Sequence, residues 1–452
     1  MSTKGTVLIF AYECYPYNRN GSAIGAQRPY QFAQNLAQLG WKVIVVCCDN
    51  KKRRSLEARE LDQTIEESYQ LHHHSLKHEA YTLVPLPSLR FYGFWDRIWI
   101  NSVKPGPGDT YLGKKFPYSI ARRISTFCNQ LYYGDYSWSW TPVAGAFVKR
   151  MIQEHKVDMI IGEHGPDAGI LLADQVSRAY TIPWIADFRD PVLLPFKGLL
   201  KSMYAGVVKK IVSSALATIN VNAHWTSLDR LHFGKEAYTI VNGYEHEVFE
   251  RIPAYSFSTF TVSYFGSIKE ESQDIIPSLK AFALLLEKTG YPKDVTLFYR
   301  GFSKETVLTN AKKIGIEEHY LDIDGFIERE ETIARMKGSS VLLIYSFAPH
   351  KVKNRYEEKG FYPGKIFEYI GAGAPILLSP SDNGLLASLI NEQNKGLASS
   401  SVEEAAEFLL QKYKQWQLKT SAHVSRSTDA ELYSRHAQAV QLDKILLSYL
   451  QR

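Results

Sequence analysis

Short apolar runs alternate with segments of helical periodicity along most of this 452-residue chain. Residues 6–12 are the clearest of these runs, and residues 157–162 predict another buried strand. An apolar run of this length without polar alternation is typical of a strand that is buried on both faces, as in a parallel sheet covered by helices. The sequence therefore predicts an α/β fold. Its length predicts two or three domains, because a single core rarely grows so large.

The composition is that of an ordinary globular protein, with 45% hydrophobic and 22% charged residues. No apolar run reaches the roughly 18 residues of a membrane span, and the apolar strand near the start is too short for a signal peptide. The cysteines show no metal or redox spacing, which favours a reducing cytoplasm. A net charge of +6 permits attraction to anionic lipid or a phosphate-bearing substrate, but the chain lacks the basic run typical of nucleic-acid binding.

The first strand is followed by a loop with glycines, a helix and a second strand, which together predict a β-α-β unit. The loop contains Gly21, Ser22 and Gly25, and Arg28 adds a cation beside them. The dinucleotide fingerprint Gly-x-Gly-x-x-Gly is absent. An ordinary surface loop is the competing interpretation.

Two later strands end in polar residues. Residues 157–162 lead into Glu163 and His164, and residues 182–186 lead into Asp187-Phe188-Arg189-Asp190. Open parallel sheets bind ligands at the carboxyl ends of their strands, so this pattern favours a binding site. An Asp–Arg pair that only stabilises a turn would give the same pattern.

Residues 364–378 predict a loop, a short helix, a glycine stop and a buried strand. The start of a helix favours an anion such as a diphosphate, and Lys365 adds a full positive charge there. Glu368 lies one turn further on and can accept hydrogen bonds from a ribose diol. The two side chains are typical of a nucleotide clamp, although a surface salt bridge on an amphipathic helix would show the same spacing.

Three motifs occur in an order that resembles glycosyltransferase family 4, in particular the bacterial members that build surface polysaccharides. They are Asp-Phe-Arg-Asp-Pro at 187–191, Asn-Gly at 242–243 and Lys-x-x-Glu-Tyr at 365–369. The resemblance implies a GT-B fold, with two facing Rossmann-like domains and a C-terminal helix that crosses back to the first. We accordingly expect an acceptor-side domain at 1–245, a nucleotide-sugar domain at 246–428 and the crossing helix at 429–452.

The same resemblance implies roles for particular residues. Glu368 would hold the ribose of the donor and Lys365 would lie near its phosphates. The strand end at which many members carry a sugar-contacting histidine has Arg189 here. The candidate catalytic residues are therefore Arg189, Asp190 and His164. The candidate donor-binding residues are Gly21, Ser22, Gly25, Asn242, Gly266, Ser267, Lys269, Arg300, Lys365 and Glu368.

The chain departs from the family after the first strand of the second domain. Members commonly have an arginine there that grips the diphosphate, whereas this chain has Gly266-Ser267-Ile268-Lys269. Lys269 or Arg300 would have to substitute for it. The first glutamate of the family pattern would fall at Gly360, so the contact with the donor sugar is also altered.

No metal or other cofactor is expected. His74 and His78 share a helix face without a third ligand, and a solvated surface explains them better. Asp322 and Asp324 imitate a metal-binding Asp-x-Asp, but GT-B enzymes generally need no metal.

Residues 81–140 combine many aromatic side chains with arginines and lysines, and we interpret them as an insertion in the first domain. Such a mixture suits a surface that contacts anionic lipid, and residues 90–123 are the proposed contact. An acceptor pocket or ordinary packing would use the same residue types.

Taken together, the motifs predict a hexosyltransferase that moves a sugar from a nucleotide-diphosphate donor to a glycan, lipid-linked or other hydroxyl acceptor. Retention of configuration follows from the resemblance. The expected location is the cytoplasm, peripheral to the inner face of the membrane. A non-catalytic GT-B partner subunit and a nucleotide-sugar epimerase or hydrolase on the same fold are the alternatives.

Overall fold

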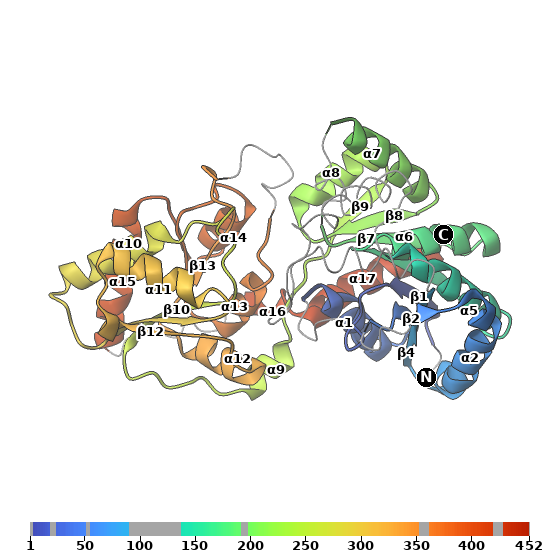
Figure 1. Cartoon of the computed structure of the whole chain (residues 1–452), viewed down its shortest axis with the longest axis horizontal. Coiled ribbons are helices and arrows are strands. Elements are labelled where there is room, and N and C mark those ends of the chain that lie inside the picture. Colours follow the sequence, from blue (N-terminus) through green and yellow to red (C-terminus); the bar gives the residue numbers. More distant parts are fainter. Residues whose placement is uncertain are drawn as a thin grey trace. The chain divides into compact units, whose positions relative to one another are not determined.

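The computed structural model describes residues 3–18, 24–50, 55–89, 137–190, 198–351, 361–418 and 428–451. Gly21, Ser22 and the predicted lipid contact at 90–123 lie outside the described residues. The chain forms two compact units (Figure 1). The first comprises Met1–Ile240 with Ala439–Arg452, and the second comprises Val241–Gln438.

The first unit is built on a seven-stranded parallel sheet in the order β4-β2-β1-β6-β7-β8-β9. Its strands are β1 (Thr6–Ala11), β2 (Lys42–Cys48), β4 (Tyr81–Leu86), β6 (Met159–His164), β7 (Trp184–Phe188), β8 (Ala217–Asn220) and β9 (Glu236–Thr239). The chain builds outward from β1 in one direction and then resumes on its other side at β6. The gap between the carboxyl ends of β1 and β6 is therefore the topological switch point, where open sheets bind ligands.

Helices cover both faces of the first sheet because the side chains of each strand alternate between them. Val7 and Ile9 pack in one core with α1 (Ile24–Gln38) and α17 (Arg435–Leu450). Leu8 and Phe10 pack in the other core. That second core is shared with α2 (Leu61–His78), α5 (Thr141–Ile152), α6 (Ala168–Tyr180) and α7 (Gly198–Val212), and α8 (Ala223–Phe233) adjoins β8 and β9.

The ends of the predicted aromatic insertion belong to the body of the first unit. Tyr81–Leu86 is β4, which pairs with β2 through Val43↔Tyr81 to Cys48↔Leu86. Trp140 is fully buried and meets the ring of Tyr12 edge-on at 5.8 Å. Burial of these apolar side chains explains their presence without an interfacial role. No helix in the described part of the chain is long and apolar enough to cross a membrane.

The second unit repeats the same plan with a six-stranded parallel sheet in the order β12-β11-β10-β13-β14-β15. Its strands are β10 (Phe260–Phe265), β11 (Val295–Arg300), β12 (Leu321–Asp324), β13 (Val341–Ile344), β14 (Ile376–Leu378) and β15 (Gly396–Ala398). Its switch point lies between β10 and β13. The two sheets confirm the predicted pair of Rossmann-like domains.

Two cores flank the second sheet. One is shared by α10 (Ile276–Lys288), α11 (Lys304–Ile314) and α15 (Val402–Gln417). The other is shared by α9 (His246–Arg251), α12 (Arg329–Gly338), α13 (Ile366–Ala372) and α14 (Leu385–Glu392), with α16 (Thr428–Glu431) against α13. The chain enters this unit at Val241, and α17 belongs to the first unit from Ala439 onward.

Candidate functional site

Lys365 and Gly266 meet at the carboxyl end of β10, beside the switch point of the second sheet. Gly266 has a φ of +120°, and a Cβ on it would overlap the ammonium group of Lys365. The Nζ atom of Lys365 lies 5.0 Å from the centre of the Tyr264 ring. Glycine is required at position 266 both for the backbone conformation and for the space that the lysine fills.

The ammonium group of Lys365 lies in a desolvated environment. Burial lowers its pKa to about 8, Glu368 opposes this effect and Lys269 adds to it. Within the described part of the chain, the ammonium group has no hydrogen bond or ion pair. A desolvated cation without a contacting carboxylate favours an anionic ligand.

Glu368 lies one turn after Lys365, on α13, as the sequence predicts. Its Oε1 atom is 3.2 Å from Nη1 of Arg329, at the start of α12. Nη2 of Arg329 donates to Glu245, whose Oε1 atom lies 4.0 Å from Nη1 of Arg435. Sequence analysis missed Arg329 because it is 39 residues from Glu368 and no spacing rule joins them.

The remaining donor-binding candidates of the second unit lie around the same edge. Ser267 and Lys269 are exposed after β10, and the carbonyl of Ser267 accepts a 2.9 Å hydrogen bond from Tyr264. Asn242 is half-buried in the segment between β9 and α9. Arg300, at the end of β11, donates to Asp322 at 2.7 Å and stacks on Phe298 at 4.1 Å.

In the first unit, the ends of β6 and β7 bring Glu163 and Arg189 together. Nε of Arg189 is 2.5 Å from Oε1 of Glu163, which is only 1% exposed. The guanidinium donates a hydrogen bond to the carbonyl of Gly165, and a Cβ on Gly25 or Gly165 would collide with it. Burial raises the pKa of Glu163 to about 8, with Arg189 opposing. Gly25 therefore lies beside Arg189, and the absence of a Cβ at Gly25 leaves space for the guanidinium group.

Arg28 and Asp187 form a second pair, and Asp187 is the register partner of Glu163 on the neighbouring strand. Nε and Nη2 of Arg28 contact the two oxygens of Asp187 at 2.8 and 2.7 Å, and Nη1 donates to the carbonyl of Ile240 at 3.0 Å. Both side chains are nearly inaccessible to solvent. The sequence analysis considered Arg28 as a cation near the donor, and the structure shows all of its nitrogens bonded within the first unit.

The other catalytic candidates lie close to Arg189. Nε2 of His164 is 2.8 Å from Oδ1 of Asp167, and Oδ2 of Asp167 accepts a hydrogen bond from Tyr204. Asp190 is exposed. Sequence analysis missed Asp229, a buried carboxyl that accepts a 2.8 Å hydrogen bond from Asn220. Burial raises the pKa of Asp229 to about 7, with Asn220 opposing. It lies on a helix, where an aspartate carries no recognisable signal.

The predicted absence of a metal stays a prediction. The rings of His74 and His78 are 4.7 Å apart on α2. Asp322 pairs with Arg300, and Asp324 pairs with Lys304 at 2.9 Å. The described part of the chain contains no group of three or more acidic, histidine or cysteine side chains arranged to hold a metal ion.

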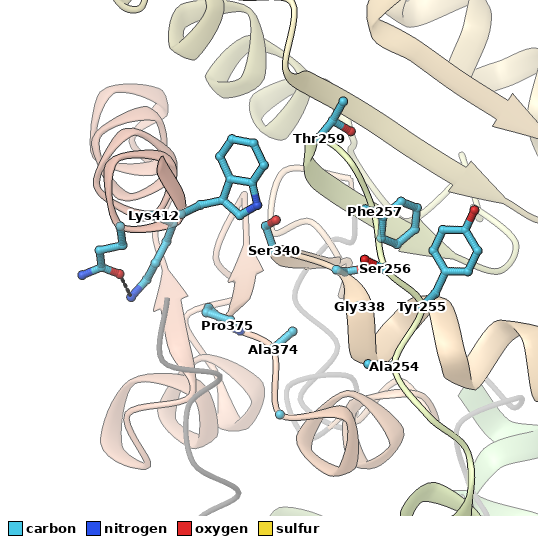
Figure 2. A pocket seen from close by; sticks show the side chains of 14 residues that line it. Ala254, Tyr255, Ser256, Phe257, Thr259, Gly338, Ser340, Ala374, Pro375 and Lys412 are labelled. Atoms are coloured by element: carbon cyan, nitrogen blue, oxygen red, sulfur yellow. Dashed lines mark hydrogen bonds between the residues drawn. The ribbon is translucent and has the colours of Figure 1, made fainter. Parts of the chain in front are cut away.

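A cavity of about 360 Å³ lies at the opposite edge of the second sheet (Figure 2). Thr259, Ser340 and Pro375 line it just before β10, β13 and β14 begin, so it opens at the amino ends of the strands. Its lysine, Lys412, donates to Gln415 at 3.3 Å. Lacking a free cation and lying away from the switch point, this cavity is a poor candidate for the nucleotide site.

Neither a protein-family model nor a curated protein sequence matches the chain. Solved structures do match it over nearly its whole length. HepE from Anabaena, in complex with UDP and glucose, is 13% identical with a TM-score of 0.56, covering 98% of this chain and 100% of HepE. The chain has the GT-B fold.

Two further structures support that assignment. Sucrose-phosphate synthase from Thermosynechococcus elongatus is 12% identical with a TM-score of 0.58, covering 99% and 100% of the two chains. A glycosyltransferase from Rickettsia africae is 12% identical with a TM-score of 0.56 and covers 99% of each. A likeness at this identity establishes the fold, and function has to be argued from the site.

Proposed function

We propose that the protein is a nucleotide-sugar-dependent glycosyltransferase with its donor site at the carboxyl edge of the second sheet. The observation that carries the proposal is Lys365, a desolvated cation beside Gly266 at the switch point, with the carboxylate of Glu368 one turn away. Solved structures of the same fold support it, because HepE was crystallised with UDP and with UDP-glucose.

Each part of the donor has a chemical counterpart at this edge. The ammonium of Lys365 suits the diphosphate, with Lys269 and the backbone near Ser267 on the same side of β10. The missing Cβ of Gly266 allows a phosphate to approach the main chain closely. Glu368 suits the ribose diol, since an ionised carboxylate only accepts hydrogen bonds.

The proposed catalytic residues are Arg189, Asp190 and His164. The chain shows no evident protein nucleophile, so we propose that the acceptor attacks on the same face from which the diphosphate leaves, with retention. Lys365 would stabilise the charge that develops on the leaving diphosphate. A hexosyl donor and a glycan or lipid-linked acceptor are part of this proposal, as are cytoplasmic location and lipid contact through residues 90–123.

An epimerase or hydrolase is the second candidate, because a putative UDP-N-acetylglucosamine 2-epimerase from Listeria monocytogenes shares the fold at a TM-score of 0.50. Such an enzyme acts on the nucleotide sugar without an acceptor. Conversion of the sugar donor in the absence of any acceptor would favour it over a transferase. The non-catalytic partner subunit predicts no conversion at all.

The first experiment is thermal unfolding with UDP, GDP and ADP, on the wild type, Lys365→Met and Glu368→Ala. A ligand at 100 times its Kd should add about 2.7 kcal/mol to the free energy of unfolding. We expect one diphosphate, UDP in the first instance, to stabilise the wild type and neither variant. Lys312→Met, on the exposed side of α11, is the matched control and should respond like the wild type. If no diphosphate stabilises the wild type at millimolar concentration, the donor site is absent.

A further inference from the structure

Arg329 has a specific place in this site that no motif assigns to it. We propose that Arg329 is a positioning residue, which orients the carboxylate of Glu368 so that its remaining lone pairs face the ribose diol of a nucleotide. This inference rests on the proposed donor site. It adds a determinant of selectivity for ribose over deoxyribose.

The first argument is the geometry of the guanidinium. One nitrogen, Nη1, donates to Glu368 at 3.2 Å, and the other, Nη2, donates to Glu245. An isolated surface ion pair would fix little, because two long side chains lose entropy in holding one geometry. A planar guanidinium held at both ends between two carboxylates has far less freedom. The side chains of Glu245 and Glu368 are only 23% and 21% exposed, which restricts them further.

The second argument is that Glu245, at the far end, is itself anchored. The backbone of the preceding residue, Tyr244, donates a 3.0 Å hydrogen bond to the carbonyl of Tyr433 and accepts one of 2.9 Å from Arg435, the first residue of α17. Tyr244 is buried, and its ring packs against Gly371 of α13, where a Cβ would collide with it. The backbone hydrogen bonds of Tyr244 therefore help to fix Glu245, Glu245 holds one end of the Arg329 guanidinium, and the other end orients the carboxylate of Glu368.

The third argument is the hydrogen-bonding capacity left on Glu368. A carboxylate offers about four lone-pair directions on its two oxygens. Arg329 takes one of those on Oε1, and Oε2 has no hydrogen bond within the described part of the chain. Two acceptors therefore remain for a vicinal diol, in an orientation that Arg329 sets. The opposite possibility is that Arg329 competes with the ribose for the carboxylate, and the two cases predict opposite results.

The test compares binding of UDP and 2′-deoxy-UDP by titration calorimetry on the full chain. A hydrogen bond to a charged group is worth roughly tenfold or more in affinity, so the wild type should prefer UDP by about that factor. Arg329→Met should reduce the preference to about threefold or less while leaving the affinity for 2′-deoxy-UDP unchanged. Arg329→Lys should be intermediate, because an ammonium group cannot bridge both carboxylates.

Two more variants separate this inference from the proposed function. Glu368→Gln removes the charged acceptor and should also reduce the preference. If Glu368→Gln does so but Arg329→Met does not, or if Arg329→Met binds UDP more tightly, the positioning role is wrong and the donor site stands. If Glu368→Gln leaves the preference intact, the donor site itself is wrong. Arg251→Met, an exposed arginine 3.7 Å from Glu330, is the matched control.

A substitution at Arg329 that prevents folding would not end the test. Glu245→Gln removes only the outer anchor of Arg329 and leaves Arg329 and Glu368 in place. It should weaken the preference for UDP to a smaller extent than Arg329→Met. An unchanged preference in a folded Glu245→Gln protein would contradict the proposed role of the contacts from Glu245 through Arg329 to Glu368.

Discussion

The carboxyl edges of the two sheets share the same topology but differ in how their charged side chains are paired. In both sheets the order of the strands reverses beside the first strand, and charged residues lie at that point. In the first unit, Arg28 forms an ion pair with Asp187 in which both side chains are buried, and Arg189 contacts the buried carboxyl group of Glu163. In the second unit, the ammonium group of Lys365 is desolvated, and no carboxylate among the residues that the structure describes contacts it. A buried cation that is paired with a carboxylate helps to hold a strand end in place, whereas a desolvated cation without a contacting counterion favours the binding of an anion.

We expect the largest effect from removing one partner of the buried ion pair between Arg28 and Asp187 in the first unit. Asp187→Asn should cost about 3–5 kcal/mol of stability, because Arg28 would keep a buried charge without its counterion. Urea unfolding measures the effect. Glu407→Gln, in an exposed pair with Lys288, is the control and should change stability by less than about 0.5 kcal/mol. A change below about 1 kcal/mol for Asp187→Asn would show that the pair is not structural.

The next prediction concerns the charge of Lys365 in the second unit. Because the pKa of Lys365 is lowered to about 8, its charge is present below that pH and is lost above it. Affinity for UDP should therefore fall about tenfold per pH unit between about pH 8 and 9.5. Lys365→Arg, which stays charged, should bind equally over that range. A wild type as insensitive to pH as this variant would exclude Lys365 from the phosphate contact.

The smallest effect is expected for Glu163→Gln, which should change the free energy of unfolding by less than about 1 kcal/mol at about pH 6. Burial raises the pKa of Glu163 to about 8, so the wild-type carboxyl group already carries its proton at that pH. The folded state then binds more protons than the unfolded state between about pH 4.5 and 8. Wild-type stability should fall relative to the variant as the pH rises through that window. Urea unfolding at several pH values gives both quantities. A loss of 3 kcal/mol or more at about pH 6 would instead show an ionised pair with Arg189.

The alternation of apolar runs with helical segments was enough to predict an α/β fold, whereas the pair of Rossmann-like domains was inferred from the resemblance of the motifs to a family. Residues 6–12 are apolar on both faces, as expected for a strand that helices cover on both sides. Lys365 and Glu368 were also predicted together, since one turn of helix sets their spacing. The edge strand β4 was harder to recognise, because its half-exposed residues alternate with buried ones and resemble the aromatic segment that follows.

Periodicity and turn residues act over a few positions, so the order of strands and helices can be predicted from the sequence alone. Which charged side chains meet depends on the tertiary structure. Arg28 and Asp187 are 159 residues apart, and Arg329 and Glu368 are 39 apart. Parallel strands bring their carboxyl ends to one edge regardless of separation along the chain, so ionic partners are selected by topology rather than by spacing. Folding thus neutralises Arg28 and leaves Lys365 available.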